Sequence, residues 1–504
     1  HTDATFLFPS RWEGERMPDW YSLVAPLTVS VSTGSPRTWV WLAEGAGHSV
    51  TFTPGPAERL HLFLPGRRRA DETLHLRGTI TDRFRNPPAF GQPLDFGFDL
   101  ELEDTDGNVV ELELDGSRLE APHRFAIPLP DLEPGVYRAC ARKRETGEVI
   151  ARSNPLEVLP AQDDRTPRIY WGEIHTHSEM SDGYGGFAEL YRHARDEGAM
   201  DFVSAADHLM SFCETEWLHM QDIANRFDDP ERFCALIGYE WQARCVYTSR
   251  RRLRAYREPT QKELSGLMAF YRNDPEVVLG PHATLGHRLD WKHHDPEVQR
   301  FVEMSATWGV NDFRDNPRAP DWIGSDEGLT INDILRTGAR LGFTGGGDIH
   351  CGRAGFSNED PERQGTMPHD QYYLHLYKDG MTGAALDRLD RHALIQGIRN
   401  RQTYATTGAR ILLDFAVGQL AMGQEGRPRE HRCRAIVHAA APLARLRIIR
   451  DGEVAYEQDE TGLDAALDWL DPAPGDQPHW YYVDVLQQDS EMAWSSPVYT
   501  DAPT

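Results

Sequence analysis

Residues 170–183 read Tyr-Trp-Gly-Glu-Ile-His-Thr-His-Ser-Glu-Met-Ser-Asp-Gly, an apolar start followed by several possible metal ligands. In a β-strand, side chains at positions i and i+2 point to the same face, so His175 and His177 can present both imidazoles to one cation. Asp182 follows in the next loop and adds a carboxylate. Two alternating histidines alone are more often an ordinary strand pair, but the Ser-Asp-Gly that follows favours a metal site. The stretch therefore predicts a strand that ends in metal ligands.

The chain after residue 168 alternates between short apolar segments and helical patterns. Apolar residues recur on one helical face between Phe187 and Gly198, and the apolar segment 201–206 follows directly. Further strands are expected at 233–238, 276–280, 300–304 and 342–346, and helices at 261–273, 330–341 and 383–399. Such alternation is typical of parallel βα units. We therefore expect an α/β fold for this part of the chain.

Both flanks of this region have a β pattern. Between Leu27 and Pro160, alternating runs at 38–42, 60–64 and 94–102 are separated by Gly, Pro and Asp turns, and 132–140 with 149–153 resembles a closing hairpin. This favours an N-terminal β-sandwich. Strand-like segments return at 443–449 and 479–486. The expected domains are a β-sandwich at 1–160, a metal-binding domain at 168–410 and a C-terminal β domain at 411–504.

Composition limits the possible partners and compartments. A net charge of −26 over 504 residues argues against nucleic-acid binding, which needs Lys and Arg to neutralise phosphates. No apolar run is long enough to span a membrane, and an acidic surface is a poor match for anionic lipids. The six cysteines form no CxxC pair, and the start His1-Thr2-Asp3 has no signal-peptide pattern. We therefore expect a protein of the cytoplasm that binds a small molecule and not nucleic acid or membranes, and the oligomeric state stays open.

Four more polar clusters follow predicted strands. They are Asp207-His208, Glu240-Trp241, Pro281-His282 with His287 five residues later, and Asp348-Ile-His350 after the glycines 345–347. Each alone has an ordinary explanation, such as a helix cap or a salt bridge. Burying an unpaired Glu240 is costly, however, and requires a cation or a hydrogen-bonding partner. Polar clusters at the carboxyl ends of successive strands are the arrangement in which βα barrels build their sites, and together they predict bound metal.

These motifs resemble the PHP (polymerase and histidinol phosphatase) superfamily. The shared pattern is His175-Thr-His177 with Ser-Asp182-Gly, then Asp207-His208, Glu240, Pro-His282 and Asp348-Ile-His350. The neighbouring residues are closer still to one uncharacterised branch, with Tyr-Trp-Gly at 170–172, Gly-Tyr-Glu-Trp at 238–241, His-Cys-Gly-Arg at 350–353, Thr-Tyr-Ala-Thr-Thr-Gly at 403–408 and Ala-Trp-Ser-Ser-Pro at 493–497. The resemblance covers about residues 168–410. It implies a distorted (βα)7 barrel flanked by the two β domains.

The resemblance also implies two or three divalent ions. Carried over residue by residue, it assigns His175, His177, Glu240 and Asp348 to one ion, Glu240 and His282 to a second, and Asp182, His208 and His350 to a third. Nitrogen and oxygen ligands without thiolate suit Mn, Zn or Fe. One family histidine is missing, because no histidine lies between Glu240 and His282. The second site is then weaker, completed by His287 or water, or empty.

The resemblance implies a hydrolase, with phosphoesters as the favoured substrates. Metal ions lower the pKa of bound water and stabilise both oxygens of an in-line displacement. Glu240 would orient the attacking hydroxide and Asp207 would orient a ligand, which makes these two the candidate catalytic residues. Arg353 is a candidate for binding an anionic substrate, with a structural salt bridge as the alternative, and His287 contacts substrate if water fills the second site. Two rival functions remain: metal-dependent hydrolysis of an amide, lactone or ester, and binding by a protein with a vestigial barrel.

Overall fold

The computed structural model describes residues 56–501 apart from several segments. Those segments are 83–87, 89–96, 115, 122, 184, 258–262, 283, 286–290, 317, 319–327, 351 and 356–377. The strand expected at 38–42 and the first residues of the one expected at 94–102 lie outside the described residues. Strands dominate the described chain, which holds five α-helices. None of these helices is long and apolar enough to cross a lipid bilayer.

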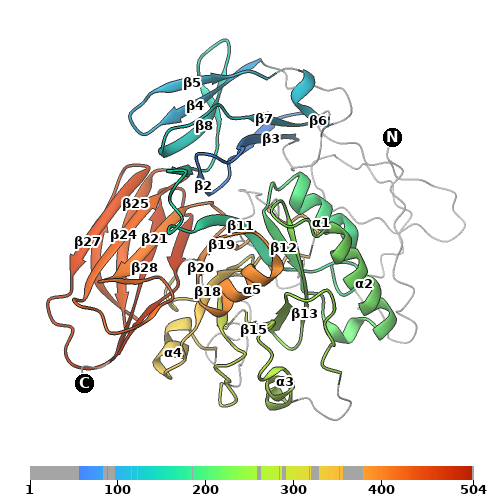
Figure 1. Ribbon diagram of the computed structural model, residues 1–504, viewed down its shortest axis with the longest axis vertical. Helices are drawn as coiled ribbons and strands as arrows, with labels where there is room; N and C mark the ends of the chain where they lie inside the picture. The colour runs from blue at the N-terminus through green and yellow to red at the C-terminus, as the bar shows by residue number, and fades with distance from the viewer. Residues whose placement is uncertain are drawn as a thin grey trace, which may run out of the picture.

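The N-terminal region is a β-sandwich (blue to cyan in Figure 1). Its strands are β1 (Arg59–Phe63), β2 (Arg67–Arg69), β3 (His75–Thr81), β4 (Phe98–Asp104), β5 (Val109–Leu112), β6 (Leu119–Ala121), β7 (Arg124–Pro128), β8 (Gly135–Lys143), β9 (Val149–Arg152) and β10 (Leu156–Leu159). Alternate residues of β1 are the more buried ones, as expected for a strand with one face on the core. Leu62 and Phe125 of one sheet share that core with Leu100 and Ala139 of the other. The hairpin expected at 132–153 is confirmed as the antiparallel pair β8–β9.

The central region combines strands and helices. Its elements are β11 (Arg168–Thr176), α1 (Phe187–Asp196), β12 (Phe202–Ala205), α2 (Glu214–Phe227), β13 (Cys234–Glu240), β14 (Arg244–Thr248), α3 (Leu264–Tyr271), β15 (Val277–Pro281), β16 (Phe301–Ala306), β17 (Gly309–Val310), α4 (Ile331–Arg336), β18 (Gly342–Gly345), β19 (Met381–Leu386), α5 (Arg391–Arg399) and β20 (Thr403–Thr406). Every residue of β12, β13 and β15 is buried, which explains their nearly continuous apolar sequence. Phe187, Leu190, Tyr191 and Ala194 form the buried face of α1, as the periodicity predicts.

The predicted (βα)7 barrel is wrong. Among the described strands of the central region, parallel ladders join only β11 to β12, β12 to β13 and β16 to β18. The strand β14 pairs antiparallel with both β13 and β15, and β19 pairs antiparallel with both β11 and β20. The chain reverses after Glu240 through Gln242 and Ala243, both with positive φ, so a hairpin stands where a βα crossover was expected. The result is a mixed, mostly β architecture.

Two local expectations also need correction. The helix expected at 383–399 forms only as α5, because its first part is the strand β19, in which all six residues are buried. The helix α2 was not predicted from the sequence. The strands expected at 201–206, 233–238, 276–280, 300–304 and 342–346 are confirmed as β12, β13, β15, β16 and β18.

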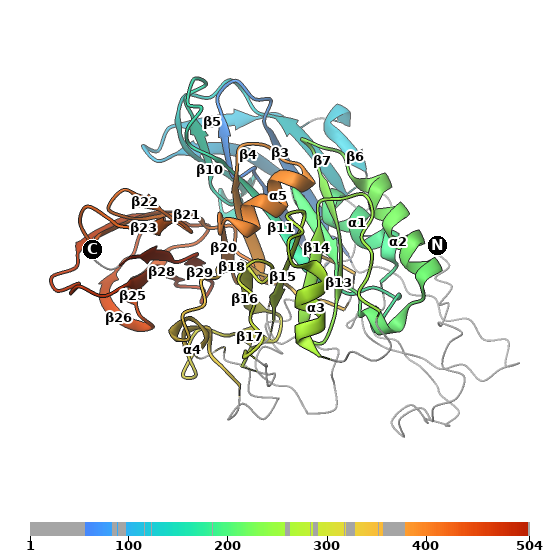
Figure 2. The ribbon, with the colours of Figure 1, turned by 60° about the horizontal axis from the view of Figure 1, so that its bottom comes forward.

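The C-terminal region contains two facing sheets. Its strands are β21 (Leu412–Val417), β22 (Leu420–Ala421), β23 (Glu425–Gly426), β24 (Arg432–His438), β25 (Leu443–Arg450), β26 (Glu453–Asp459), β27 (Asp464–Leu470), β28 (His479–Gln487), β29 (Met492–Ser495) and β30 (Val498–Thr500). Phe415 and Val437 of one sheet belong to the same core cluster as Leu446 and Val483 of the other. In Figure 2 these strands lie on one side of the central strands, while α1 and α2 lie on the other. The exact domain boundaries stay predictions.

Candidate metal centre

The histidines and carboxylates expected to bind metal meet at one place in the central region. Each comes from a strand end or the loop after it: His175 is the penultimate residue of β11, Glu240 ends β13, His282 follows β15, and His208 and Asp348 lie in the loops after β12 and β18. The side chains of His175 and His177 are fully buried. Strand ends fix these residues because the backbones that carry them are hydrogen-bonded into the sheet.

Four side chains face one another with the spacing of a tetrahedral ion site. The Nε2 atoms of His175 and His177 lie 3.2 Å apart. Asp348 Oδ1 lies 3.5 and 3.0 Å from these two nitrogens, and Glu240 Oε2 lies 3.7 and 3.5 Å from them. Ligand atoms about 2.0–2.1 Å from a tetrahedral ion are about 3.3 Å from one another. The measured spacings are close to that value, so these residues fit a divalent ion.

Two oxygens of this set lie near imidazole nitrogens but make no well-aligned hydrogen bond. They are Glu240 Oε2 and Asp348 Oδ1, both inaccessible to solvent. A buried carboxylate oxygen without a partner is destabilising, by about 1–3 kcal/mol or more for a charged group. Both atoms point toward the imidazole nitrogens described above. A cation between them would satisfy both oxygens.

Electrostatics also favours ionised carboxylates at this place. Burial alone would raise the pKa of Glu240 and of Asp348. The neighbouring imidazoles, led by His282 for Glu240 and by His175 for Asp348, instead hold both pKa values well below the usual range. Both side chains are therefore in the charged form that binds cations.

A second group of donor atoms lies on the solvent side of the first. Asp182 Oδ2 is 3.3 Å from His208 Nε2 and 3.3 Å from His350 Nε2. Burial would raise the pKa of Asp182, but the hydrogen bonds from these two imidazoles lower it far below its usual range. Burial would lower the pKa of His208, yet Asp182 and Glu240 raise it to about 9. The structure thus brings together the three residues assigned to a third ion.

Glu240 connects the first group to His282. Its Oε1 atom lies 3.0 Å from His282 Nε2 and accepts a hydrogen bond from the Ala243 amide, while Oε2 faces the other histidines. The two oxygens therefore face different donor groups, as a bridging carboxylate requires. Cys245 contacts His175, and burial, together with Glu303, raises the pKa of this thiol to about 12 despite that contact. The thiol is thus in its neutral form beside the cluster.

Glu303 and Trp308 contact residues of the cluster, and the sequence analysis did not identify either of them. Glu303 Oε2 lies 3.0 Å from His175 Nδ1, which leaves Nε2 of that ring facing the other ligands. Trp308 Nε1 donates to Asp348 Oδ2 at 2.6 Å. Carboxylates behind metal-binding histidines orient the ring and raise its basicity. The signal for Glu303 was a single carboxylate within the apolar segment 301–306. Its atoms also lie near enough to those of His175 and His282 to form a possible metal-binding group.

Asp207 orders the loop that carries His177. Its carboxylate accepts hydrogen bonds from the amide and hydroxyl of Ser178, both at 2.8 Å, and from the hydroxyl of Ser181 at 2.6 Å. Ser181 Oγ in turn lies 3.2 Å from His177 Nδ1 and 3.1 Å from Asp182 Oδ1. Asp207 therefore reaches the cluster through Ser181 and acts as a positioning residue.

The glycine segment before Asp348 lies against buried carboxylates of the protein. Residues 348–350 do not repeat strand geometry, because β18 ends at Gly345 and Asp348 has a φ of 48°. A side chain at Gly346 would collide with the Glu303 carboxylate, and one at Gly347 with that of Glu173. Gly346 and Gly347 thus make room for these two buried carboxylates.

The two candidate substrate-binding residues remain predictions. Arg353 is half-buried in the short described stretch 352–355 that follows His350. His287 lies outside the described residues.

Comparisons with known proteins give distant relatives only. No protein-family model matches the chain. Proteins of Chlamydia muridarum and Chlamydia trachomatis, both named "Uncharacterized protein", are 25% identical over 486 residues and 26% identical over 487, with 85% of this chain and 75% of each relative covered. The resemblance to the PHP superfamily therefore stays a proposal.

The solved structures that align with the chain include β-glucuronidases. Those of Parabacteroides merdae and Bacteroides uniformis (β-glucuronidase 2, a calcium-binding mutant) each share 10% identity, with TM-scores of 0.21 and 0.16. The alignments cover 89% and 88% of this chain and 64% and 62% of those enzymes. Similarity this low carries no argument about fold or function.

Proposed function

We propose that the chain is a metal-dependent hydrolase that acts on phosphate esters. The observation that carries the proposal is the group of His175, His177, Glu240 and Asp348, whose facing atoms have tetrahedral spacing and include two buried oxygens without partners. Resemblance to the PHP superfamily agrees with this proposal but does not test it. Manganese, zinc and iron all suit the nitrogen and oxygen donors.

The residues around the cluster divide into binding and positioning roles. His175, His177, Glu240 and Asp348 would hold the first ion. Glu303 fixes the ring of His175, and Asp207 acts on His177 through Ser181. Divalent ions in such a site supply Lewis-acid activation of water and neutralise charge on a phosphoryl group.

Substrate reaches the cluster from the side of Asp182 and His208. Their side chains are 30% and 34% exposed, whereas those of His175 and His177 are fully buried. An ester would therefore approach the second donor group first, with its phosphoryl group toward the buried ligands. Arg353, in the stretch after His350, is the proposed contact for the anionic part of the substrate.

We favour phosphate esters over carboxyl substrates because several groups of metal-binding side chains lie next to one another and could hold adjacent ions. Adjacent ions can bind both the attacking and the leaving oxygen of an in-line displacement. The two oxygens of Glu240 face His282 on one side and His177 on the other, which suits a shared carboxylate between two ions. Hydrolysis of an amide, lactone or ester remains the first rival, and binding without catalysis the second.

A substrate panel tests the proposal. The purified full chain is stripped of metal, reloaded separately with Mn²⁺, Zn²⁺ or Fe²⁺, and assayed with p-nitrophenyl phosphate, bis-p-nitrophenyl phosphate and p-nitrophenyl acetate. We expect phosphate-ester hydrolysis that appears on reloading and disappears on chelation. Hydrolysis of the acetate alone would favour the carbon-centre rival. Bound metal without any turnover across a wider ester panel would favour a binding protein.

A further inference from the structure

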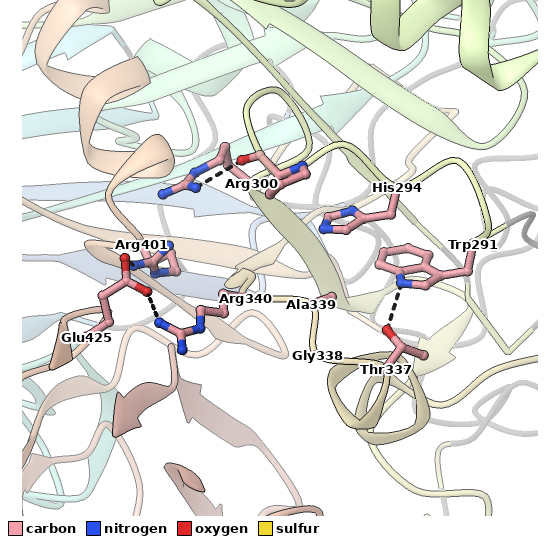
Figure 3. A pocket seen from close by; sticks show the side chains of 10 residues that line it. Trp291, His294, Arg300, Thr337, Gly338, Ala339, Arg340, Arg401 and Glu425 are labelled. Carbon is pink, nitrogen blue, oxygen red and sulfur yellow. Dashed lines mark hydrogen bonds and ion pairs between the residues drawn. The ribbon is translucent and has the colours of Figure 1, made fainter. Parts of the chain in front are cut away.

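A pocket lies at the ends of the strands β16 and β18 that are remote from the candidate metal centre (Figure 3). Arg300 immediately precedes β16 and Arg340 lies just before β18, whereas Asp348 of the candidate metal centre follows β18. Because β16 and β18 run parallel, the two sites sit at opposite ends of this pair. The pocket has a volume of about 420 Å³, within the usual range for small-molecule sites.

One wall of the pocket carries an excess of positive charge. Arg300, Arg340 and Arg401 line it together with a single carboxylate, Glu425. Glu425 is paired with Arg340 at 2.5 Å and lies 3.5 Å from Arg401. Asp501, which does not line the pocket, forms a second ion pair with Arg340, with 3.3 Å between Asp501 Oδ1 and Arg340 Nη2. The wall thus has three guanidinium groups and one carboxylate.

Arg300 is the cation of this wall that lacks an acidic partner among the described residues. Its guanidinium donates to the backbone carbonyls of Arg399 at 2.9 Å and Pro296 at 3.0 Å. Burial and the nearby charges of Arg401 and Arg399 lower the pKa of Arg300. An anion in the pocket would relieve this repulsion. The planar guanidinium group also matches the geometry of phosphate oxygens.

The other wall of the pocket is aromatic. Trp291 and His294 stack with ring centroids 5.0 Å apart and planes inclined by 12°. Trp291 Nε1 donates to Thr337 Oγ1 at 3.0 Å, which fixes the orientation of the indole ring. Figure 3 shows the arginines on one side of the pocket and this ring pair on the other. Ring systems stack favourably on such a surface.

We propose that this pocket binds a small phosphate monoester that carries a planar aromatic ring, with the phosphate on the arginine wall and the ring beside Trp291. Mononucleotides are the simplest molecules of this chemistry. The pocket is separate from the candidate metal centre, so this binding needs no metal and involves no hydrolysis. It adds a ligand site to the proposed enzyme.

The test is calorimetric titration of the full chain in EDTA, with AMP as the probe and with adenosine and inorganic phosphate as its two halves. We expect AMP to bind at least about tenfold more tightly than either half, because both walls contribute. Arg300→Gln should weaken AMP binding at least about tenfold, as expected for a lost charged hydrogen bond. Trp291→Leu should weaken AMP binding but leave phosphate binding unchanged.

Arg434→Gln is the matched control, since this exposed arginine of β24 pairs with Asp468 away from the pocket. It should bind AMP as the unaltered chain does, and circular dichroism checks that each variant is folded. The inference is overturned if AMP does not bind, or if it binds no more tightly than inorganic phosphate. It is also overturned if both pocket variants retain full affinity, because AMP then binds elsewhere. If Arg300→Gln fails to fold, Trp291→Leu alone decides between these outcomes.

Discussion

Two buried pairs of carboxylates in this protein differ in their neighbours and in their acidity. Glu240 and Asp348 lie among imidazoles, and their pKa values are held well below the usual range despite burial. Burial raises the pKa of Asp312, in the loop after β17, to about 7 with a further contribution from the charge of Asp484, and it raises the pKa of Asp484 of β28 to about 6. Burial is common to both pairs. Several imidazoles face the first pair, whereas the second has one nearby cation, Arg447, 3.6 Å from Asp484.

The comparison shows which buried acids are suited to hold a cation. Trp494 Nε1 and Asn316 Nδ2 both donate to the Asp312 carboxylate, so each of its oxygens has a partner. Glu240 and Asp348, by contrast, each keep one buried oxygen without a hydrogen bond. Asp484 also keeps one buried oxygen without a hydrogen bond, but its other oxygen lies 3.6 Å from Arg447 Nε. An unsatisfied oxygen that faces several imidazole nitrogens therefore indicates a missing cation, whereas the hydrogen-bonded Asp312 has a structural role.

Removing one of the ionised carboxylates should cause the largest loss of metal-dependent hydrolysis. We expect Asp348→Asn to lower metal-dependent hydrolysis by more than about 100-fold, because losing a ligand costs more than losing a residue that orients one. Asp468→Asn, at an exposed carboxylate of β27, is the control and should retain activity. Turnover numbers of the metal-reloaded proteins provide the measurement. Unchanged turnover in Asp348→Asn would remove this residue from the site.

Changing the carboxylate behind His175 should have a smaller effect. Glu303→Gln keeps the size of the side chain but removes the charge that faces His175 Nδ1 at 3.0 Å. We expect metal affinity to fall by about 10–100-fold, the usual range for residues that orient a ligand. Competition with a chelating dye measures this affinity, and Glu457→Gln on the exposed face of β26 is the control. Equal affinities in the two variants would show that Glu303 has only a packing role.

The last prediction concerns stability instead of the metal site, at the acids that lack imidazole neighbours. A carboxyl group whose pKa is raised on folding binds more protons in the folded state, so the free energy of unfolding falls as pH rises. For Asp312 this fall should extend from the usual pKa of 3.8 to about 7, at about 1.4 kcal/mol per pKa unit. In Asp312→Asn, thermal midpoints measured across this range should depend less on pH. Asp387→Asn, at an exposed position, should keep the full dependence. An Asp312→Asn profile parallel to that of the unaltered chain would refute the assignment.

Much of the metal centre could be predicted from the sequence because its ligands occupy regular positions. His175 and His177 follow the two-residue repeat of a strand, and Glu240 and His282 stand where apolar segments end. Glu303 was missed because it lies inside an apolar segment, although the cost of burying an unpaired acid applies to it as it does to Glu240. Trp308 and Ser181 leave no sequence signal, since their roles depend on contacts between distant segments.

The fold was harder to predict than the site. Apolar periodicity located β12, β13, β15, β16 and β18, but it does not encode strand direction. The segment 244–248 continues the sheet as an antiparallel strand because the chain reverses just after Glu240. The segment 381–386 is a buried strand although its small residues also suit a helix. A barrel inferred from the alternation of elements therefore failed where tertiary pairing decided the outcome.

Metal content tests the central claim most directly. The full chain is expressed with added Mn, Zn or Fe, freed of loosely bound ions and analysed by mass spectrometry for metal per chain. We expect at least about one equivalent of metal in the unaltered chain. His175→Ala/His177→Ala should lose most of it, because tight metal binding needs the complete set of coordinating side chains. The exposed pair variant His392→Ala/His219→Ala should keep its metal. Less than about half an equivalent in the unaltered chain, or full occupancy without His175 and His177, would contradict the account.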